Sequence, residues 1–113
     1  MKKMFLQNIV NTTAKILRIK TKLVRMKKIN GGRANKSYIS IPLWVKDYDT
    51  AYQIYYAVHE ICHYKKGCNK HNILFKEIED KMLALWNIEI ERKKAYPKYI
   101  YYKGQFVENI PKW

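Results

Sequence analysis

One helix constrains this chain more than any other feature, because the sequence marks both of its ends. Asp47 to Thr50 offers N-capping side chains, and two lysines followed by Gly67 suit the C-terminal end of a helix. The pattern predicts a helix over residues 51–66. At helical spacing one face carries Ile54, Ala57, Val58, Ile61 and Cys62, and another carries Tyr52, Tyr55, Tyr56, His59 and His63.

The segment before this helix predicts one more helix and two strands. Residues 3–18 place their apolar side chains mostly at helical spacing, so we expect an amphipathic helix that backs the core. Residues 20–28 alternate loosely and residues 37–41 cleanly, and the Asn-Gly-Gly sequence at 30–32 can supply positive φ angles. We expect two antiparallel strands joined around that turn, with Pro42 ending the second.

A second long helix is predicted over residues 71–94, where apolar residues recur at steps of three and four until Tyr96-Pro97 ends the pattern. The aromatic and basic tail, residues 96–113, shows no clear period. The predicted fold class is therefore α+β, with a backing helix, a small antiparallel hairpin or sheet, two long helices and a C-terminal segment. A length of 113 residues allows a single domain, 1–113.

Composition removes several classes of protein. The 23 Lys and Arg against 9 Asp and Glu give a net charge of +14, but 48% hydrophobic residues are too many for a disordered basic tail. No uncharged stretch reaches the length of a membrane span, and polar residues interrupt the N-terminal apolar run before it resembles a signal peptide. We expect a cytoplasmic protein without a membrane partner, and the Lys, Ile and Tyr content suits a thermophilic source.

The sequence His59-Glu60-Ile61-Cys62-His63 matches H-E-x-x-H inside the best-delimited helix. Two imidazoles at i and i+4 project from one face of a helix at a spacing that can hold a single Zn²⁺. Glu60, which lies between them, can take a proton from a zinc-bound water and pass it to the leaving amine. The motif predicts His59 and His63 as zinc ligands and Glu60 as the catalytic residue.

Hydrolytic zinc normally has three protein ligands, so a third must come from elsewhere in the chain. The helix that follows Gly67 offers four candidates within reach, and helical geometry alone does not choose among them. They are His71, Glu77, Glu79 and Asp80.

Residues 58–64 with the following FKEIEDKMLALW segment resemble the gluzincin metallopeptidases, in which two motif histidines and a glutamate from a later helix bind zinc. In that family the glutamate is often followed seven residues on by alanine. Glu77 and Ala84 reproduce this spacing, so the resemblance implies Glu77 as the third ligand. In another group of small H-E-x-x-H proteins an H-x-x-x-F element supplies a third histidine, and His71 with Phe75 fits that alternative.

The short length and the order of elements resemble the minigluzincins of thermophilic prokaryotes. This resemblance implies that the strand before the motif helix pairs with substrate, a role that falls to Ser37, Tyr38, Ile39 and Ser40. It also implies that residues 96–113 keep the enzyme latent by blocking the cleft, within one chain or between two as a homodimer or higher oligomer. The alternative is a tail that completes the core.

Two functions are thus predicted from the sequence. The first is a zinc endopeptidase that acts on peptides or proteins. The alternative is a basic nucleic-acid-binding or DNA-associated protein with a structural zinc site, supported by the charge of +14. A structural site that also used Cys62 and Cys68 would crowd three ligands from one helix around a tetrahedral ion, and Cys62 is expected to be a core residue.

Overall fold

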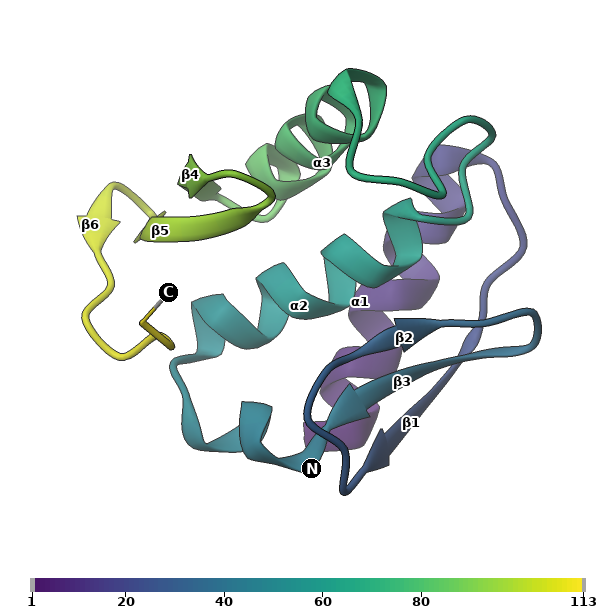
Figure 1. Cartoon of the computed structure of the whole chain (residues 1–113), viewed down its shortest axis with the longest axis horizontal. Helices are drawn as coiled ribbons and strands as arrows, with labels where there is room; N and C mark the ends of the chain where they lie inside the picture. The colour runs from purple at the N-terminus through teal and green to yellow at the C-terminus, as the bar shows by residue number, and fades with distance from the viewer. Residues whose placement is uncertain (1, 113) are drawn as a thin grey trace.

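A computed structural model describes residues 2–112, and within them three α-helices surround or adjoin two small three-stranded sheets (Figure 1). The α+β class predicted from the sequence is confirmed. The elements are α1 (Lys2–Leu17), β1 (Leu23–Lys27), β2 (Arg33–Ala34), β3 (Tyr38–Pro42), the 3₁₀-helix η1 (Leu43–Asp47), α2 (Thr50–Cys62), α3 (Ile73–Leu85), β4 (Ile88–Lys93), β5 (Tyr96–Tyr102) and β6 (Gln105–Phe106).

Helix α2 lies at the centre of the fold, with α1 against its back, the first sheet on one side, and α3 with the second sheet on the other (Figure 1). Its N-terminus is capped by Asp49, whose carboxylate accepts a hydrogen bond from the Ala51 N–H at 2.9 Å. The helix ends at Cys62, four residues before the predicted end, and Gly67 turns the chain at φ 84°. Eleven of its thirteen residues are buried, so the surrounding elements fix the position of α2 and of its side chains.

The first sheet has the order β1-β3-β2, which differs from the predicted antiparallel hairpin. Strands β1 and β3 are parallel, and the short β2 pairs antiparallel with the other edge of β3. The reversal into β3 comes at Asn35, whose side chain accepts hydrogen bonds from the N–H groups of Ser37 and Tyr38 at 3.2 and 3.1 Å. The segment between β1 and β3 contains β2, which runs back along β3 and forms an edge of the sheet.

Helix α3 stops at Leu85, so the helix predicted over residues 71–94 is wrong for its last third. Asn87 adopts a φ of 62°, which takes the chain out of the helix, and β4 begins at Ile88. Strands β4, β5 and β6 form an antiparallel sheet in which Ile90 pairs with Ile100. Ile88 of β4 and Ile100 of the predicted tail are buried, so the second sheet contributes to the core.

In the part of the chain that the structure describes, every helix is too short or too polar to cross a bilayer. The two cysteines are buried as free thiols, and Cys62 lies in the core as expected.

Candidate metal centre

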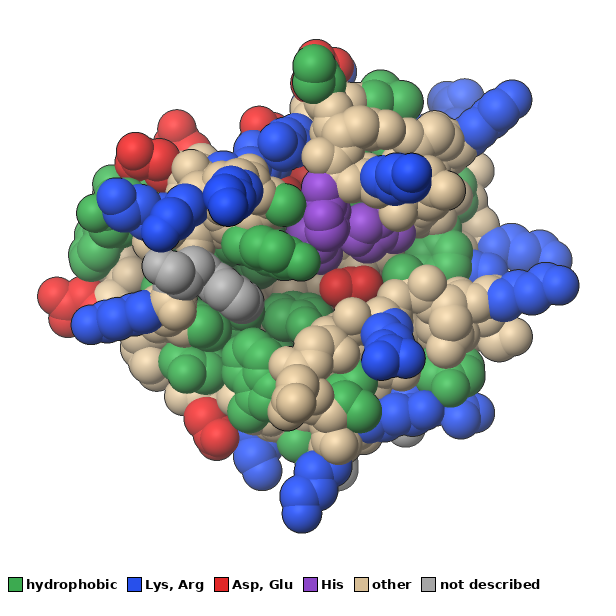
Figure 2. Space-filling model, in the orientation of Figure 1, with side chains coloured by type: hydrophobic (Ala, Val, Ile, Leu, Met, Phe, Trp, Pro, Cys, Tyr) green, Lys and Arg blue, Asp and Glu red, His purple; other side chains and the backbone are tan. Residues whose placement is uncertain are grey.

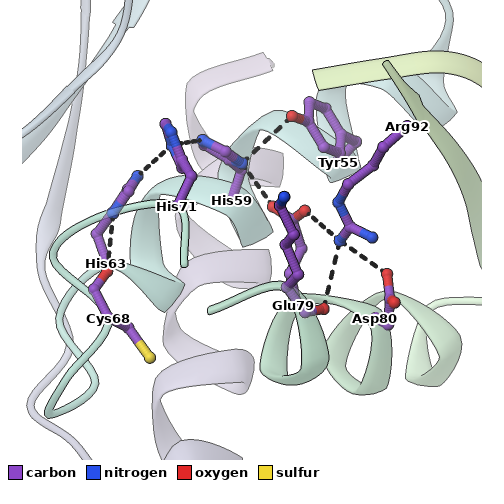
Figure 3. Close-up of polar contacts among 9 residues, drawn as sticks. Tyr55, His59, His63, Cys68, His71, Glu79, Asp80 and Arg92 are labelled. Atoms are coloured by element: carbon purple, nitrogen blue, oxygen red, sulfur yellow. Dashed lines mark hydrogen bonds and ion pairs between the residues drawn. The ribbon is translucent and has the colours of Figure 1, made fainter. Parts of the chain in front are cut away.

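Three histidines converge beside α2 (Figure 3). His59 and His63 project from one face of α2, and His71 comes from the loop that precedes α3. The Nε2 atom of His71 lies 3.0 Å from Nε2 of His59 and 3.1 Å from Nε2 of His63. The motif pair and the alternative third ligand predicted from the sequence are thus brought together.

The loop that carries His71 is fixed by the next residue, Asn72. Its side-chain oxygen accepts a hydrogen bond from the Phe75 N–H at 2.8 Å, which caps α3, and its side-chain NH₂ donates to the Gly67 carbonyl at 2.9 Å. One asparagine therefore ties the start of α3 to the turn that follows α2. His71 is positioned by both ends of this connection.

The outer ring nitrogens of the two motif histidines have acceptors of their own. Nδ1 of His63 lies 3.0 Å from the Cys68 carbonyl, and Nδ1 of His59 lies 2.5 Å from a carboxylate oxygen of Glu79. A carbonyl and a carboxylate can only accept, so both imidazoles carry their proton on Nδ1. The Nε2 atoms of His59 and His63 then each direct a lone pair toward Nε2 of His71. A cation or a proton between these nitrogens offsets the repulsion of the lone pairs.

The three histidine nitrogens lie within 4.8 Å of one another, and the two separations from His71 suit a tetrahedral ion. A metal–nitrogen bond of about 2.0–2.1 Å places neighbouring nitrogens about 3.3 Å apart, close to the observed separations from His71. Burial, together with the neighbouring His59, lowers the pKa of His63 to about 4, and the pKa of His71 is lowered by the same causes. A lowered pKa favours the neutral form of His63 and His71, which is the form that binds a metal.

Glu79, one of the four candidate third ligands, contacts the outer nitrogen of His59 and does not join the three histidines. Its side chain is fully buried, with one carboxylate oxygen on His59 and the other 2.7 Å from an Nη2 donor of Arg92 in β4. The same Nη2 lies 2.8 Å from the exposed Asp80. A carboxylate that holds the outer nitrogen of a ligating histidine fixes the ring orientation and raises its basicity. The sequence contained a signal for this role, since Glu79 lies one helical turn after Phe75 on the same face.

Glu77, the third ligand that the resemblance implied, is not brought to this group. Its side chain is exposed, because it lies two residues, or about 200° of rotation, from both Phe75 and Glu79 on the buried face of α3. Ala84 is exposed as well, so the Glu77–Ala84 spacing follows the solvent side of the helix. His71 takes the third place instead.

The cysteines also lie outside the donor group. Cys62 packs in the core, and Cys68 contributes its carbonyl oxygen rather than its thiol to the surroundings of His63. Burial raises the pKa of both thiols, which keeps them protonated. The alternative with cysteine ligands is therefore not the arrangement that forms.

The histidines open into a cleft of about 620 Å³ (Figure 2). Glu60 lines it and is only 6% exposed, and burial raises the pKa of this carboxyl to about 7. Among the described residues that line the cleft, Glu60 and Arg33 are the two with charged side chains apart from histidine. A buried carboxyl with a raised pKa thus lines the same cleft as the three histidines.

The strand expected to bind substrate does not line this cleft. Ser37 precedes β3, and Tyr38, Ile39 and Ser40 belong to β3, the central strand of its sheet, where Ile39 and Ser40 are buried. Both edges of β3 are already paired. Residues 30–35, the loop before β2 and β2 itself, line the cleft instead.

The C-terminal segment reaches the cleft at Tyr96. The Tyr96 ring centroid lies 6.0 Å from that of His59 and 5.6 Å from that of His71. Residues 97–106 belong mainly to the second sheet, and Trp113 lies outside the described residues. Latency and oligomer formation through this segment stay predictions.

Comparisons with known proteins add no relative: no protein-family model matches the chain, and neither curated proteins nor solved structures give a match.

Gly32 lines the cleft and packs against Tyr56, and its replacement tests how closely the two residues fit. Its N–H donates a hydrogen bond to the Tyr56 hydroxyl at 2.5 Å, and a Cβ here would overlap the Tyr56 ring. We expect Gly32→Ala to lower the free energy of unfolding by about 1–3 kcal/mol, the usual effect of overpacking. Gly31→Ala is the control, since a Cβ there meets open space. Urea unfolding of both variants measures the difference, and equal effects would contradict the close packing of Gly32 on Tyr56.

Proposed function

We propose that this protein is a zinc-dependent peptidase in which His59, His63 and His71 bind the ion and Glu60 acts as general base. The observation that carries the proposal is the convergence of three imidazole Nε2 atoms at an open cleft that Glu60 also lines. Three neutral nitrogen ligands suit Zn²⁺ and leave a fourth position for water or substrate, as in hydrolytic zinc sites.

The roles of the chain's own groups follow from their positions. A zinc ion at this site would polarise the scissile carbonyl and lower the pKa of the attacking water. Glu60 would take the proton of that water and deliver it to the amine nitrogen as the peptide bond breaks. Glu79 and the Cys68 carbonyl would hold the rings of His59 and His63 in place throughout.

Strand β2 is the part of the fold best placed to bind a substrate backbone. It lies at the edge of its sheet and lines the cleft, whereas β3 has both edges paired. An extended peptide that added to this edge would gain main-chain hydrogen bonds along Arg33 and Ala34. The substrate-binding role expected of residues 37–40 therefore moves to β2 in this proposal.

The donor set also bears on the family. Two histidines and a glutamate are what the gluzincin resemblance implied, and the third donor here is His71. An H-x-x-x-F element that supplies a third histidine describes this arrangement better, because Phe75 stacks on His63 with ring centroids 4.5 Å apart. The proposal depends on the geometry of the site and not on membership of the minigluzincins.

Glu60→Gln tests the proposal directly. We expect the variant to keep zinc at about one ion per chain, and its rate of peptide hydrolysis to fall by a factor of roughly 10²–10⁴, the usual contribution of a general base. Metal analysis and cleavage of a casein-like protein or a quenched peptide give the two measurements.

The control is Glu77→Gln, which removes an exposed carboxylate from α3 and should change neither quantity. The proposal fails if the wild-type protein binds no zinc or if Glu60→Gln cleaves as fast as wild type. Tight DNA binding without any peptide cleavage would favour the nucleic-acid alternative instead.

A further inference from the structure

Aromatic side chains form the part of the cleft that lies away from the metal donors. Tyr52, Tyr55 and Tyr56 of α2 line the cleft together with Trp44 of η1. Figure 2 shows hydrophobic side chains along the hollow beyond the histidines and the acidic group. Trp44, Tyr52, Tyr55 and Tyr56 are called the aromatic wall below.

The aromatic wall is continuous with the metal donors because its three tyrosines share one face of α2 with His59. Tyr56 and Tyr52 precede His59 by three and seven residues, which is about 4.5 and 10.5 Å along a helix axis. The Trp44 ring stacks on Tyr52 at 6.4 Å and meets Tyr56 edge-on at 6.2 Å. The wall thus begins beside the metal site and extends about two helical turns from it.

Three of the wall's four polar side-chain groups have partners within the protein, and the exception is the buried Tyr52 hydroxyl. The Tyr56 hydroxyl accepts from the Gly32 N–H, and the Trp44 indole N–H donates to the Asn30 carbonyl at 3.0 Å. The Tyr55 hydroxyl lies 3.2 Å from Nδ1 of His59. Tyr52 and Tyr55 are buried, so the ring carbon that remains toward the cleft belongs mainly to the half-buried Trp44 and Tyr56, and it offers apolar contacts to a ligand.

The buried part of the aromatic wall is sheltered from water. Tyr52 is fully buried, and its hydroxyl has no hydrogen-bond partner in the described part of the chain. Burial raises the pKa of Tyr52 far above its ordinary value, and it raises that of Tyr56 to about 12, so both phenols stay neutral. A desolvated region of neutral rings favours an apolar occupant over a charged one.

We propose that the aromatic wall is a specificity subsite that accepts an aromatic side chain of the substrate, within two residues of the cleaved bond. This inference rests on the proposed peptidase function. An extended peptide advances about 3.3 Å per residue, so such a side chain reaches the wall when the scissile bond is at the metal. The rings of the wall can make edge-to-face and stacked contacts with an aromatic side chain. A cationic side chain is disfavoured by Arg33 and the net charge of +14.

Peptide cleavage measures the preference. Quenched peptides that differ at one position near the cleaved bond, with Phe, Leu, Ala, Lys or Glu there, are compared on the zinc-loaded protein. We expect kcat/KM for the Phe peptide to exceed that for the Ala peptide by about tenfold or more, the range that pocket contacts of this size provide. Equal rates, or a preference for Lys or Glu, would overturn the proposal.

Trp44→Ala should remove most of this preference, and Trp44→Phe, which keeps a ring, should restore part of it. The matched control is Leu43→Ala, because Leu43 lies on the same 3₁₀ turn, is 39% exposed and does not line the cleft. Thermal melting checks that each variant is folded. If Trp44→Ala is folded and keeps the full preference for Phe, the aromatic wall is not the subsite.

A binding measurement separates this proposal from the peptidase function. Titration of the Phe and Ala peptides into zinc-loaded Glu60→Gln protein reports affinity without turnover. If the wild type cleaves nothing, but the Phe peptide binds more tightly than the Ala peptide and Trp44→Ala abolishes the difference, the subsite stands and the peptidase function fails. If the wild type cleaves peptides and neither rate nor affinity depends on the ring, the subsite alone fails.

Discussion

Replacement of His71 with alanine is expected to weaken zinc binding by more than about 100-fold, which exceeds the usual effect of losing an outer partner of a ligand. His71 provides the Nε2 atom that lies within 3.1 Å of both motif histidines, so its loss leaves two donors for the ion. Competition with a chromophoric chelator measures the affinity. The expected loss includes the stabilisation that bound zinc gives to the folded state, visible as a smaller metal-dependent shift in the melting temperature.

Glu77→Ala is the matched comparison for His71→Ala, because the two residues are the rival third ligands and lie only six positions apart. We expect this variant to bind zinc like the wild type, since the Glu77 side chain is exposed to solvent. The reverse result, with Glu77→Ala deficient and His71→Ala normal, would restore the glutamate ligand of the gluzincins and contradict the site described above.

Glu79→Gln is expected to have the second large effect, on both stability and metal affinity. The carboxylate is fully buried between His59 and Arg92, so the neutral amide leaves the guanidinium with Asp80 alone as a charged partner. Breaking a buried pair typically costs about 3–5 kcal/mol, and we expect the metal-free protein to lose an amount of this order in urea unfolding. Zinc affinity should fall about 10–100-fold, because His59 loses its charged partner.

Asp80→Asn provides the control for Glu79→Gln, since Asp80 contacts the same Arg92 from the solvent side. Its side chain is 56% exposed, and an exposed ion pair contributes at most about 1 kcal/mol. We expect a small change in stability and none in zinc affinity. Equal effects of the two substitutions would mean that Arg92 is held by its surface partner and that Glu79 does not organise the site.

The helices before residue 86 were predictable because local signals define them. Regular apolar spacing and the Asp49 cap identify α1 and α2, while residues 86–94, which follow α3, were mistaken for helix. Ile88 and Ile90 fit a strand as well as a helix, and the positive φ of Asn87 that decides between them depends on the chain around it. The parallel pairing of β1 with β3 was missed for a similar reason, since it depends on the path of the return strand and not on either strand's own pattern.

The candidate site, like the fold, could be predicted from the sequence only in part. His59, Glu60 and His63 were identified because their spacing belongs to one helix. The choice between His71 and Glu77 depends on how α3 is rotated against α2, and residue spacing along α3 does not contain that angle. Burial of Phe75 and Glu79 on the inner face sets the rotation, which turns Glu77 outward.

The three histidines are close together in the chain as well as in space, since only twelve positions separate His59 from His71. Closing so short a loop costs little entropy, so the denatured chain retains the same donors at high local concentration and is able to capture zinc itself. The contacts that unfolding removes are those of Glu79 and Arg92, which join α2 to α3 and to the second sheet. The difference in zinc affinity between the folded protein and the unfolded chain therefore depends more on these outer contacts than on the ligands.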